Sequence, residues 1–259
     1  PNILILLTDD QSFNTINALG NKEVSTPNID KLVSNGFTFT HAHIMGSFSG
    51  AVCMPSRAML MTGQYLQKLD KVQGAIGENI KTMPQLLKES GYTTFFTGKW
   101  HNQKASFFKS FTNGENIFMG GMSNHLKVPL YSFDPSGIYP EKNKFFKDKF
   151  SSVLFKEAAV NFLREYDGIK PFFACVSFTS PHDPRMAPDD YKKKYNSEAI
   201  SLPKNFMTKH NFNNGELIIR DENLLPFPRT ENAVKEEIAA YYAMISEVDD
   251  NIGKILKVL

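Results

Sequence analysis

The chain has 259 residues, 41% hydrophobic and 22% charged, which is enough apolar content to bury a core and too much for a disordered segment. Its 29 Lys and Arg nearly balance its 27 Asp and Glu, so it lacks the basic excess of a nucleic-acid-binding protein. The longest aliphatic run, residues 3–7, is far shorter than the ~20 residues of a membrane-spanning helix. We therefore expect one large globular domain, with no nucleic-acid partner and no membrane insertion.

Strand and helix patterns alternate along the chain. Short apolar runs rich in β-forming residues predict buried strands at residues 3–7, 92–97 and 171–178. Start and stop signals predict helices at residues 25–36, 82–91 and 151–166. Because parallel strands need crossover connections, this order predicts an α/β domain with a largely parallel central sheet flanked by helices.

Two long segments interrupt this alternation. Residues 102–150 and 183–230 are rich in Asn, Pro, Phe and Lys and show no sustained period, so we expect excursions over one end of the sheet. Apolar residues then recur at helical spacing from Ile238 to Leu259, which predicts a closing amphipathic helix from about residue 231 onward.

Ionisable residues follow each predicted strand. Asp9 and Asp10 follow the first, Lys99 and His101 the second, and His182 the third. In open α/β sheets ligands bind beyond the carboxyl ends of the strands, so these residues predict one shared site. Such a site would contain two carboxylates for a hard cation, an ammonium for an oxyanion and two imidazoles for proton transfer.

The two cysteines lie in different contexts. Cys53 precedes a predicted helix in which Pro55 suits the first position and Gly63 the stop. A helix N-terminus favours negative charge, which lowers a thiol pKa or holds an anionic substrate, and Arg57 would add a planar fork of donors. Cys175 lies inside the third strand, where we expect a packing role.

Two further residues are candidate substrate contacts. His125, in the first excursion, is a candidate for lining a substrate pocket. Arg185, three residues beyond His182, is a candidate contact for an acidic or sulfated sugar. For both, a purely structural or solvated role is the alternative.

Other polar residues favour structural roles. His41 and His43 alternate with threonines and predict a strand face. Trp100 would point away from its ionisable neighbours and pack. Asp249 and Asp250 favour the polar face of the closing helix over metal ligation.

The segment Cys53-Met54-Pro55-Ser56-Arg57, with Thr62-Gly63 downstream, resembles the signature of the type I sulfatases, whose cysteine is oxidised to formylglycine after translation. Further segments also resemble the family. Residues 2–10 resemble its first strand and metal pair, and residues 26–30 resemble its next helix. Residues 98–101 resemble its Lys/His element, residues 180–182 its second histidine and residues 248–253 its closing helix. These matches follow the family order, so the resemblance to the sulfatase branch of the alkaline-phosphatase-like fold covers essentially the whole chain. Gln64 departs from the Arg or Lys of many relatives.

This resemblance implies a sulfuric ester hydrolase. Residue 53, as a hydrated aldehyde, would attack sulfur with one hydroxyl. Asp9 and Asp10, together with residue 53, would hold a divalent cation, Ca²⁺ in preference to Mg²⁺. Arg57 would orient the diol and Lys99 would neutralise the sulfate.

The resemblance also implies roles for the histidines. His182 would bind sulfate and protonate the leaving alcohol, and His101 would take a proton from the second hydroxyl and release sulfate.

Ca²⁺ usually takes about six to eight oxygen ligands. Sulfatases supply the missing ones from an Asp followed by Asn or His on a strand beyond the closing helix, with a sulfate-binding Lys further downstream. We therefore expect residues 1–259 to be the N-terminal part of a sulfatase catalytic domain that, alone, binds metal weakly and turns over poorly.

Three functions remain open at this point. The first is a hydrolase of a sulfated small molecule or glycan, matured by a formylglycine-generating enzyme. The second is a phosphomonoester or phosphonate-ester hydrolase of the same superfamily, and the third is an unmodified, non-catalytic binder of sulfated glycans. We expect an exported protein (periplasmic, extracellular or lysosome-like) whose leader has been removed.

Overall fold

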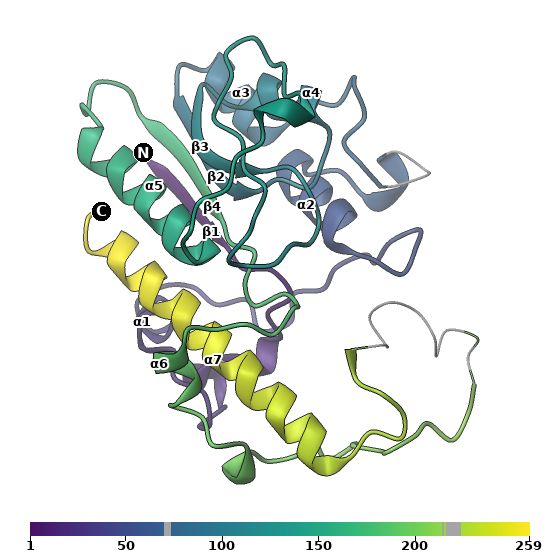
Figure 1. Ribbon diagram of the computed structural model, residues 1–259. Coiled ribbons are helices and arrows are strands. Elements are labelled where there is room, and N and C mark those ends of the chain that lie inside the picture. Colours follow the sequence, from purple (N-terminus) through teal and green to yellow (C-terminus); the bar gives the residue numbers. More distant parts are fainter. Residues whose placement is uncertain (70–73, 214, 216–223) are drawn as a thin grey trace.

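The computed structural model describes residues 1–69, 74–213, 215 and 224–259 (Figure 1). Its centre is a parallel sheet with the strand order β1-β4-β2-β3. The strands are β1 Ile3–Leu7, β2 Thr93–Lys99, β3 Asn113–Phe118 and β4 Phe172–Ser177. The expectation of an α/β domain with a largely parallel sheet is therefore confirmed.

Helices connect and cover the strands. They are α1 Pro27–Asn35, α2 Cys53–Thr62, α3 Met83–Glu89, α4 Lys104–Ser110, α5 Ser151–Glu165, α6 Asp189–Lys192 and α7 Glu231–Leu256. Short 3₁₀ turns occupy Phe13–Thr15, Asn17–Leu19, Leu66–Lys68, Glu141–Asn143 and Ser197–Ala199. Thr82 and Thr230 begin α3 and α7 by accepting N–H bonds on their hydroxyls, which satisfies donors that a helix start leaves open.

The helices form a layer on each face of the sheet. Side chains of a strand alternate between its faces, so Ile3 and Ile5 of β1 pack toward α2, α3 and α4, whereas Leu4 and Leu6 pack toward α5 and α7. Figure 1 shows α5 and α7 side by side along one face. Both faces of the sheet are thereby covered, which leaves the strand ends as the place for a site.

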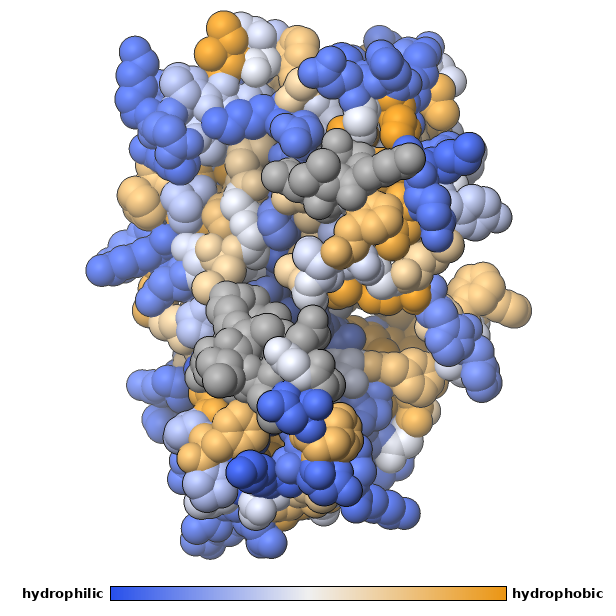
Figure 2. Space-filling model, turned by 90° about the vertical axis from the view of Figure 1, so that its right-hand side faces the viewer, coloured by the Kyte–Doolittle hydropathy of each residue, from blue (hydrophilic) through white to orange (hydrophobic). Residues whose placement is uncertain are grey.

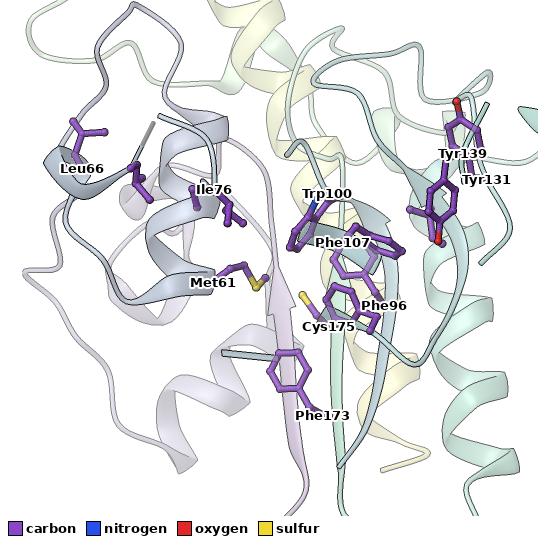
Figure 3. Close-up of a cluster of buried hydrophobic side chains, with 14 residues drawn as sticks. Met61, Leu66, Ile76, Phe96, Trp100, Phe107, Tyr131, Tyr139, Phe173 and Cys175 are labelled. Atoms are coloured by element: carbon purple, nitrogen blue, oxygen red, sulfur yellow. The ribbon is translucent and has the colours of Figure 1, made fainter. Parts of the chain in front are cut away.

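Half of the buried residues in the core between the sheet and α2 are aromatic (Figure 3). Phe96, Trp100, Phe107 and Phe111 contact one another with ring centroids 5.0–5.6 Å apart. Cys175 lies among these rings, fully buried, and burial raises the pKa of its thiol to about 12. The packing roles expected for Trp100 and Cys175 are confirmed.

The segment 102–150 contains two elements that we did not expect, α4 and β3. The expectation of an excursion without regular structure is wrong for residues 104–118. β3 begins with Asn113, Gly114 and Glu115 and lies at the edge of the sheet, where β2 is its neighbouring strand and Ile117 also bridges to Tyr131, so it lacks the continuous apolar run of a central strand. Residues 119–150 do cross the end of the sheet mostly without regular structure.

Two smaller expectations are also wrong. His41 and His43 lie in an exposed, irregular segment and not on a strand. Asp249 is fully buried, because its carboxylate accepts the backbone N–H groups of Asn28 and Ile29 at the start of α1. The positive end of the α1 dipole thus stabilises the Asp249 carboxylate of α7. The Asp250 carboxylate accepts a hydrogen bond of 2.7 Å from the Tyr191 hydroxyl.

Figure 2 shows the face at the right of Figure 1, where hydrophobic and hydrophilic side chains are interspersed. Exposed aromatic side chains include Phe37 and Phe39 in the connection between α1 and α2. Among the described residues, no helix is long and apolar enough to cross a membrane.

Candidate active site

Three loops meet at the carboxyl ends of β1, β2 and β4. Parallel pairing places these ends at one edge of the sheet, so Asp9 after β1, Lys99 at the end of β2 and His182 after β4 lie together and buried. The Asp9 N–H donates to the Ser180 carbonyl at 3.1 Å, which ties the first loop to the third. The sequence therefore identified residues that the fold brings together.

Asp9 is held between two cations. Its Oδ1 lies 3.1 Å from Arg57 Nη2, and its Oδ2 contacts Lys99 Nζ. Burial alone would raise the pKa of the Asp9 carboxyl, but the two neighbouring cations outweigh it and the pKa is lowered. We call Asp9, Arg57 and Lys99 the charged cluster. The charged cluster sets two basic side chains against one carboxylate, an arrangement that suits an anionic ligand.

Ser177, the last residue of β4, holds the charged cluster in place. Its hydroxyl accepts from Arg57 Nη1 at 2.5 Å and donates to the Lys99 carbonyl at 2.8 Å. Gly98 permits this contact: a Cβ there would lie 1.8 Å from the Ser177 carbonyl oxygen, and its φ is +101°. Sequence reasoning missed Ser177, although a hydroxyl near the end of an otherwise apolar strand was a usable signal.

Cys53 is the first residue of α2, two residues earlier than Pro55 had suggested. Its Sγ donates to Asp10 Oδ1 at 3.7 Å. The expectation of a lowered thiol pKa is wrong: burial raises the pKa of Cys53 to about 11, and the nearby Asp9 and Asp10 carboxylates raise it further against the opposing cations. The unmodified thiol is therefore protonated at neutral pH and is a poor nucleophile.

His182 is oriented by carboxylates on both ring nitrogens. Nδ1 lies 3.0 Å from Asp183 Oδ1 and 2.9 Å from the Asp183 carbonyl oxygen, and Nε2 lies 3.3 Å from Asp10 Oδ2. Carboxylate and carbonyl oxygens accept hydrogen bonds, so each ring nitrogen of His182 faces an acceptor. This arrangement fixes the plane of the ring and places Nε2 beside the Asp10 carboxylate.

His101 adopts a φ of +50° directly after β2. Gly121 makes room for its ring, since a Cβ there would lie 2.6 Å from Nε2. Burial lowers the pKa of His101 to about 4, and the Lys99 and Arg57 charges act in the same direction. The ring is therefore neutral at neutral pH, which is the form that accepts a proton.

His125 lies inside the protein at 1% exposure, so the prediction that it lines a substrate pocket is wrong. Its Nε2 donates to the His182 carbonyl at 3.0 Å, and its Nδ1 accepts from the Ser151 hydroxyl at 3.1 Å. Burial lowers the pKa of His125 to about 4, so the ring stays neutral. His125 supports the backbone of the loop that carries His182.

Arg185 lies beside the site and not within the charged cluster. Its guanidinium stacks 4.6 Å from the centroid of the Tyr241 ring and donates to the Pro181 carbonyl. The Tyr241 hydroxyl in turn donates to the Asp10 carbonyl at 2.5 Å and accepts from the Ser12 N–H at 2.8 Å. Contact between Arg185 and substrate stays a prediction.

The donor atoms at the strand ends fit a hard divalent cation. Potential ligand atoms of Asp9, Cys53 and His182 lie within 4.8 Å of one another, as do those of Asp10, His182 and Asp183. Ca²⁺ and Mg²⁺ prefer carboxylate and other oxygen ligands, and each of the two groups supplies at least one carboxylate.

The sulfatase family model matches residues 1–259, and the chain belongs to this family. It is 25% identical to an arylsulfatase of Klebsiella aerogenes, over all of this chain and 62% of that protein. An uncharacterized sulfatase of Schizosaccharomyces pombe is 27% identical over all of this chain and 54% of its own length. The chain thus spans little more than half the length of these curated relatives.

Two solved structures share the fold. One is a protein in complex with its substrate D-glucosamine-2-N,6-O-disulfate, with a TM-score of 0.74 and 21% identity over all of this chain and 62% of that chain. The other is a phosphonate monoester hydrolase of Agrobacterium radiobacter, with a TM-score of 0.73 and 18% identity over all of this chain and 59% of that chain. At these identities the likeness shows that the chain shares the fold of these structures.

Proposed function

We propose that this chain carries the active centre of a sulfuric ester hydrolase that releases inorganic sulfate from a sulfated alcohol. The observation that carries this proposal is the charged cluster: the Asp9 carboxylate held between Arg57 and Lys99, next to the Cys53 motif of the sulfatase family. The buried Arg57 and Lys99 side chains are placed to bind a sulfate ester and to stabilise the charge that develops on its oxygens.

When present, formylglycine made from Cys53 supplies a hydroxyl nucleophile in its hydrated form, and a divalent cation such as Ca²⁺ supplies a Lewis acid. Asp9, Asp10 and residue 53 would hold the cation. Lys99 and Arg57 bind and neutralise the anion, with Arg57 fixed by Ser177.

The two histidines act in different proton transfers, one as a general acid and the other as a general base. His182, whose ring is fixed by Asp183, donates a proton from Nε2 to the leaving alcohol. His101, neutral because burial lowers its pKa, accepts the proton of the second hydroxyl of residue 53. The residues of this chain thus supply both a general acid and a general base.

A carbohydrate is the substrate that we favour. The structural neighbour bound to D-glucosamine-2-N,6-O-disulfate supports this choice, as do the long polar and aromatic segments over the end of the sheet. Turnover requires a formylglycine-generating enzyme as maturation partner.

The structural similarity to a phosphonate monoester hydrolase supports one alternative, a phosphonate-ester hydrolase. The test compares initial rates on matched sulfate and phosphonate esters, using the full-length protein made in a host with the maturation enzyme. We expect the sulfate ester to be hydrolysed faster. A faster phosphonate reaction would favour the alternative hydrolase, and no turnover of either ester would favour a non-catalytic glycan binder.

The two cysteines provide a matched pair of variants for this test. Cys53→Ala removes the source of the nucleophile and abolishes turnover. Cys175→Ala removes a buried sulfur from the aromatic core, so it lowers the free energy of unfolding but retains turnover. Sulfate release by Cys53→Ala at the wild-type rate would refute the proposal.

A further inference from the structure

Asp10, in the loop that follows β1, has a backbone conformation that few residues other than glycine adopt. Its φ is +61°, in the left-handed region. A non-glycine residue persists in this region only where its surroundings hold it there. The Asp10 carboxylate lies at the centre of the site, because Oδ1 accepts from Cys53 Sγ at 3.7 Å and Oδ2 lies 3.3 Å from His182 Nε2. Whatever holds the backbone of Asp10 therefore also determines where this carboxylate lies.

Tyr241, in the first half of α7, holds this backbone. Its hydroxyl donates to the Asp10 carbonyl at 2.5 Å and accepts from the Ser12 N–H at 2.8 Å. One oxygen atom thus joins the backbone groups on both sides of Gln11. Tyr241 is 231 positions from Asp10 in the sequence and belongs to a long helix that packs against α1 and α5. The turn at Asp10 is therefore attached to a well-packed helix and not only to its own loop.

The ring of Tyr241 also holds the loop that carries His182. The Arg185 guanidinium stacks 4.6 Å from the centroid of this ring and donates to the Pro181 carbonyl. Glu237, also on α7, has its Oε2 3.9 Å from Arg185 Nε. A guanidinium stacked on an aromatic ring keeps a fixed plane. One turn of α7 therefore contacts both the loop after β1 and the loop after β4.

We propose that Tyr241 is a positioning residue for the cation site: its hydroxyl fixes Asp10, and its ring, through Arg185, fixes the loop that carries His182. Potential ligand atoms of Asp10, His182 and Asp183 come from these two loops and lie within 4.8 Å of one another. Outer hydrogen bonds orient metal ligands before the ion binds, so their loss weakens binding. The inference rests on the proposed function, because it takes Asp10 as a ligand of the cation there.

Calorimetry with CaCl₂ on metal-free, full-length protein measures this role without turnover. Tyr241→Phe keeps the ring and its stack with Arg185 and removes only the hydroxyl. We expect Ca²⁺ binding to weaken about 10- to 100-fold, as for loss of an outer hydrogen bond of a metal site. Tyr242→Phe is the matched control, since it removes a hydroxyl that accepts from Asn21 Nδ2 at 3.0 Å, and it should bind Ca²⁺ like the wild type.

Sulfate release separates positioning from damage to the fold. Tyr241→Phe should release sulfate more slowly than the wild type when Ca²⁺ is limiting. Excess Ca²⁺ should restore most of the rate, because it compensates for weaker binding. A damaged site would stay slow at every Ca²⁺ concentration.

Arg185→Met is a second variant, which leaves the hydroxyl of Tyr241 in place. It should weaken Ca²⁺ binding about two- to fivefold, the contribution of a cation–π contact. Removal of a positive charge would by itself strengthen Ca²⁺ binding, so weaker binding indicates lost positioning.

The inference would be overturned by equal Ca²⁺ affinity in Tyr241→Phe and Tyr242→Phe, by a wild type that binds no Ca²⁺, or by a lost rate that excess Ca²⁺ does not restore. If Tyr241→Phe fails to fold, Arg185→Met decides: weaker Ca²⁺ binding supports the inference, and equal or tighter binding overturns it. If the wild type releases no sulfate but Ca²⁺ binding responds as expected, the proposed function fails and the role of Tyr241 remains supported.

Discussion

Two buried polar regions lie beside the end of the sheet, and they favour opposite charge states of their side chains. In the charged cluster, Asp9 pairs with Arg57 and Lys99, and its pKa is lowered. On the side of α5 and α7, burial lowers the pKa of His125 and raises that of Glu247, so both favour their neutral forms. We call His125, Glu247 and the serines between them, Ser151, Ser152 and Ser180, the neutral network.

This difference indicates that the two regions have different functions. Charged side chains are concentrated where a sulfate ester and a cation would bind, and each of the three charged side chains of the cluster is paired there. The neutral network supports the backbone of the His182 loop, and burial disfavours charge on His125 and Glu247. Substitutions in the two regions should therefore have different signatures, in turnover for one and in stability or geometry for the other.

The largest effect is expected from Lys99→Met. This change removes a buried cation from Asp9 and from the anion site, so sulfate release should fall about 10²- to 10³-fold, as for loss of one preorganised donor. Steady-state kinetics on the full-length enzyme would measure the loss. Lys81→Met, which removes an exposed pair with Glu89, is the control and should change little. Turnover of Lys99→Met within threefold of wild type would contradict the role of the charged cluster.

Glu247→Gln tests the neutral network through stability. Burial disfavours the charged form of Glu247 and raises its pKa in the folded protein from the ordinary 4.5 to about 7. Its contribution to stability is therefore complete below pH 4.5 and is lost as the pH rises through 7.

The ionisation of Glu247 alone should lower the free energy of unfolding by on the order of 3 kcal/mol as the pH rises from 4.5 to 8. Glu247→Gln cannot ionise and should lack that part of the slope. Urea unfolding of the wild type and the variant at several pH values would measure it. Identical slopes would show that Glu247 is not held neutral by the fold.

A smaller effect is expected at His125. His125→Leu removes the donor to the His182 carbonyl, so the loop that carries His182 should shift. Because one hydrogen bond is lost, kcat should fall about 10-fold with little change in KM. His125→Gln retains an N–H that can reach this carbonyl and should recover most of kcat. If both variants lose only thermal stability, and kcat remains unchanged, His125 is a packing residue and does not position His182.

The sequence allowed the strands that are apolar along their whole length to be predicted. β1, β2 and β4 stand out as apolar or β-rich runs, whereas β3 begins with the polar residues Asn113 and Glu115 and was missed. Element order and strand ends were then enough to bring Asp9 and Lys99 together.

What the sequence could not supply are the effects of three-dimensional surroundings. A helix N-terminus alone favours a low pKa for Cys53, but burial beside Asp9 and Asp10 reverses the direction. His125 and the His182 carbonyl are 57 positions apart, so their hydrogen bond has no local signature.

The central claim is that residue 53 acts as a formylglycine and not as a thiol. The most direct measurement is the mass of the peptide that contains residue 53, from full-length protein made in a host with the maturation enzyme. Conversion of Cys to formylglycine lowers this mass by about 18 Da. We predict the lower mass in protein that releases sulfate. An unmodified Cys53 in fully active protein would contradict the account.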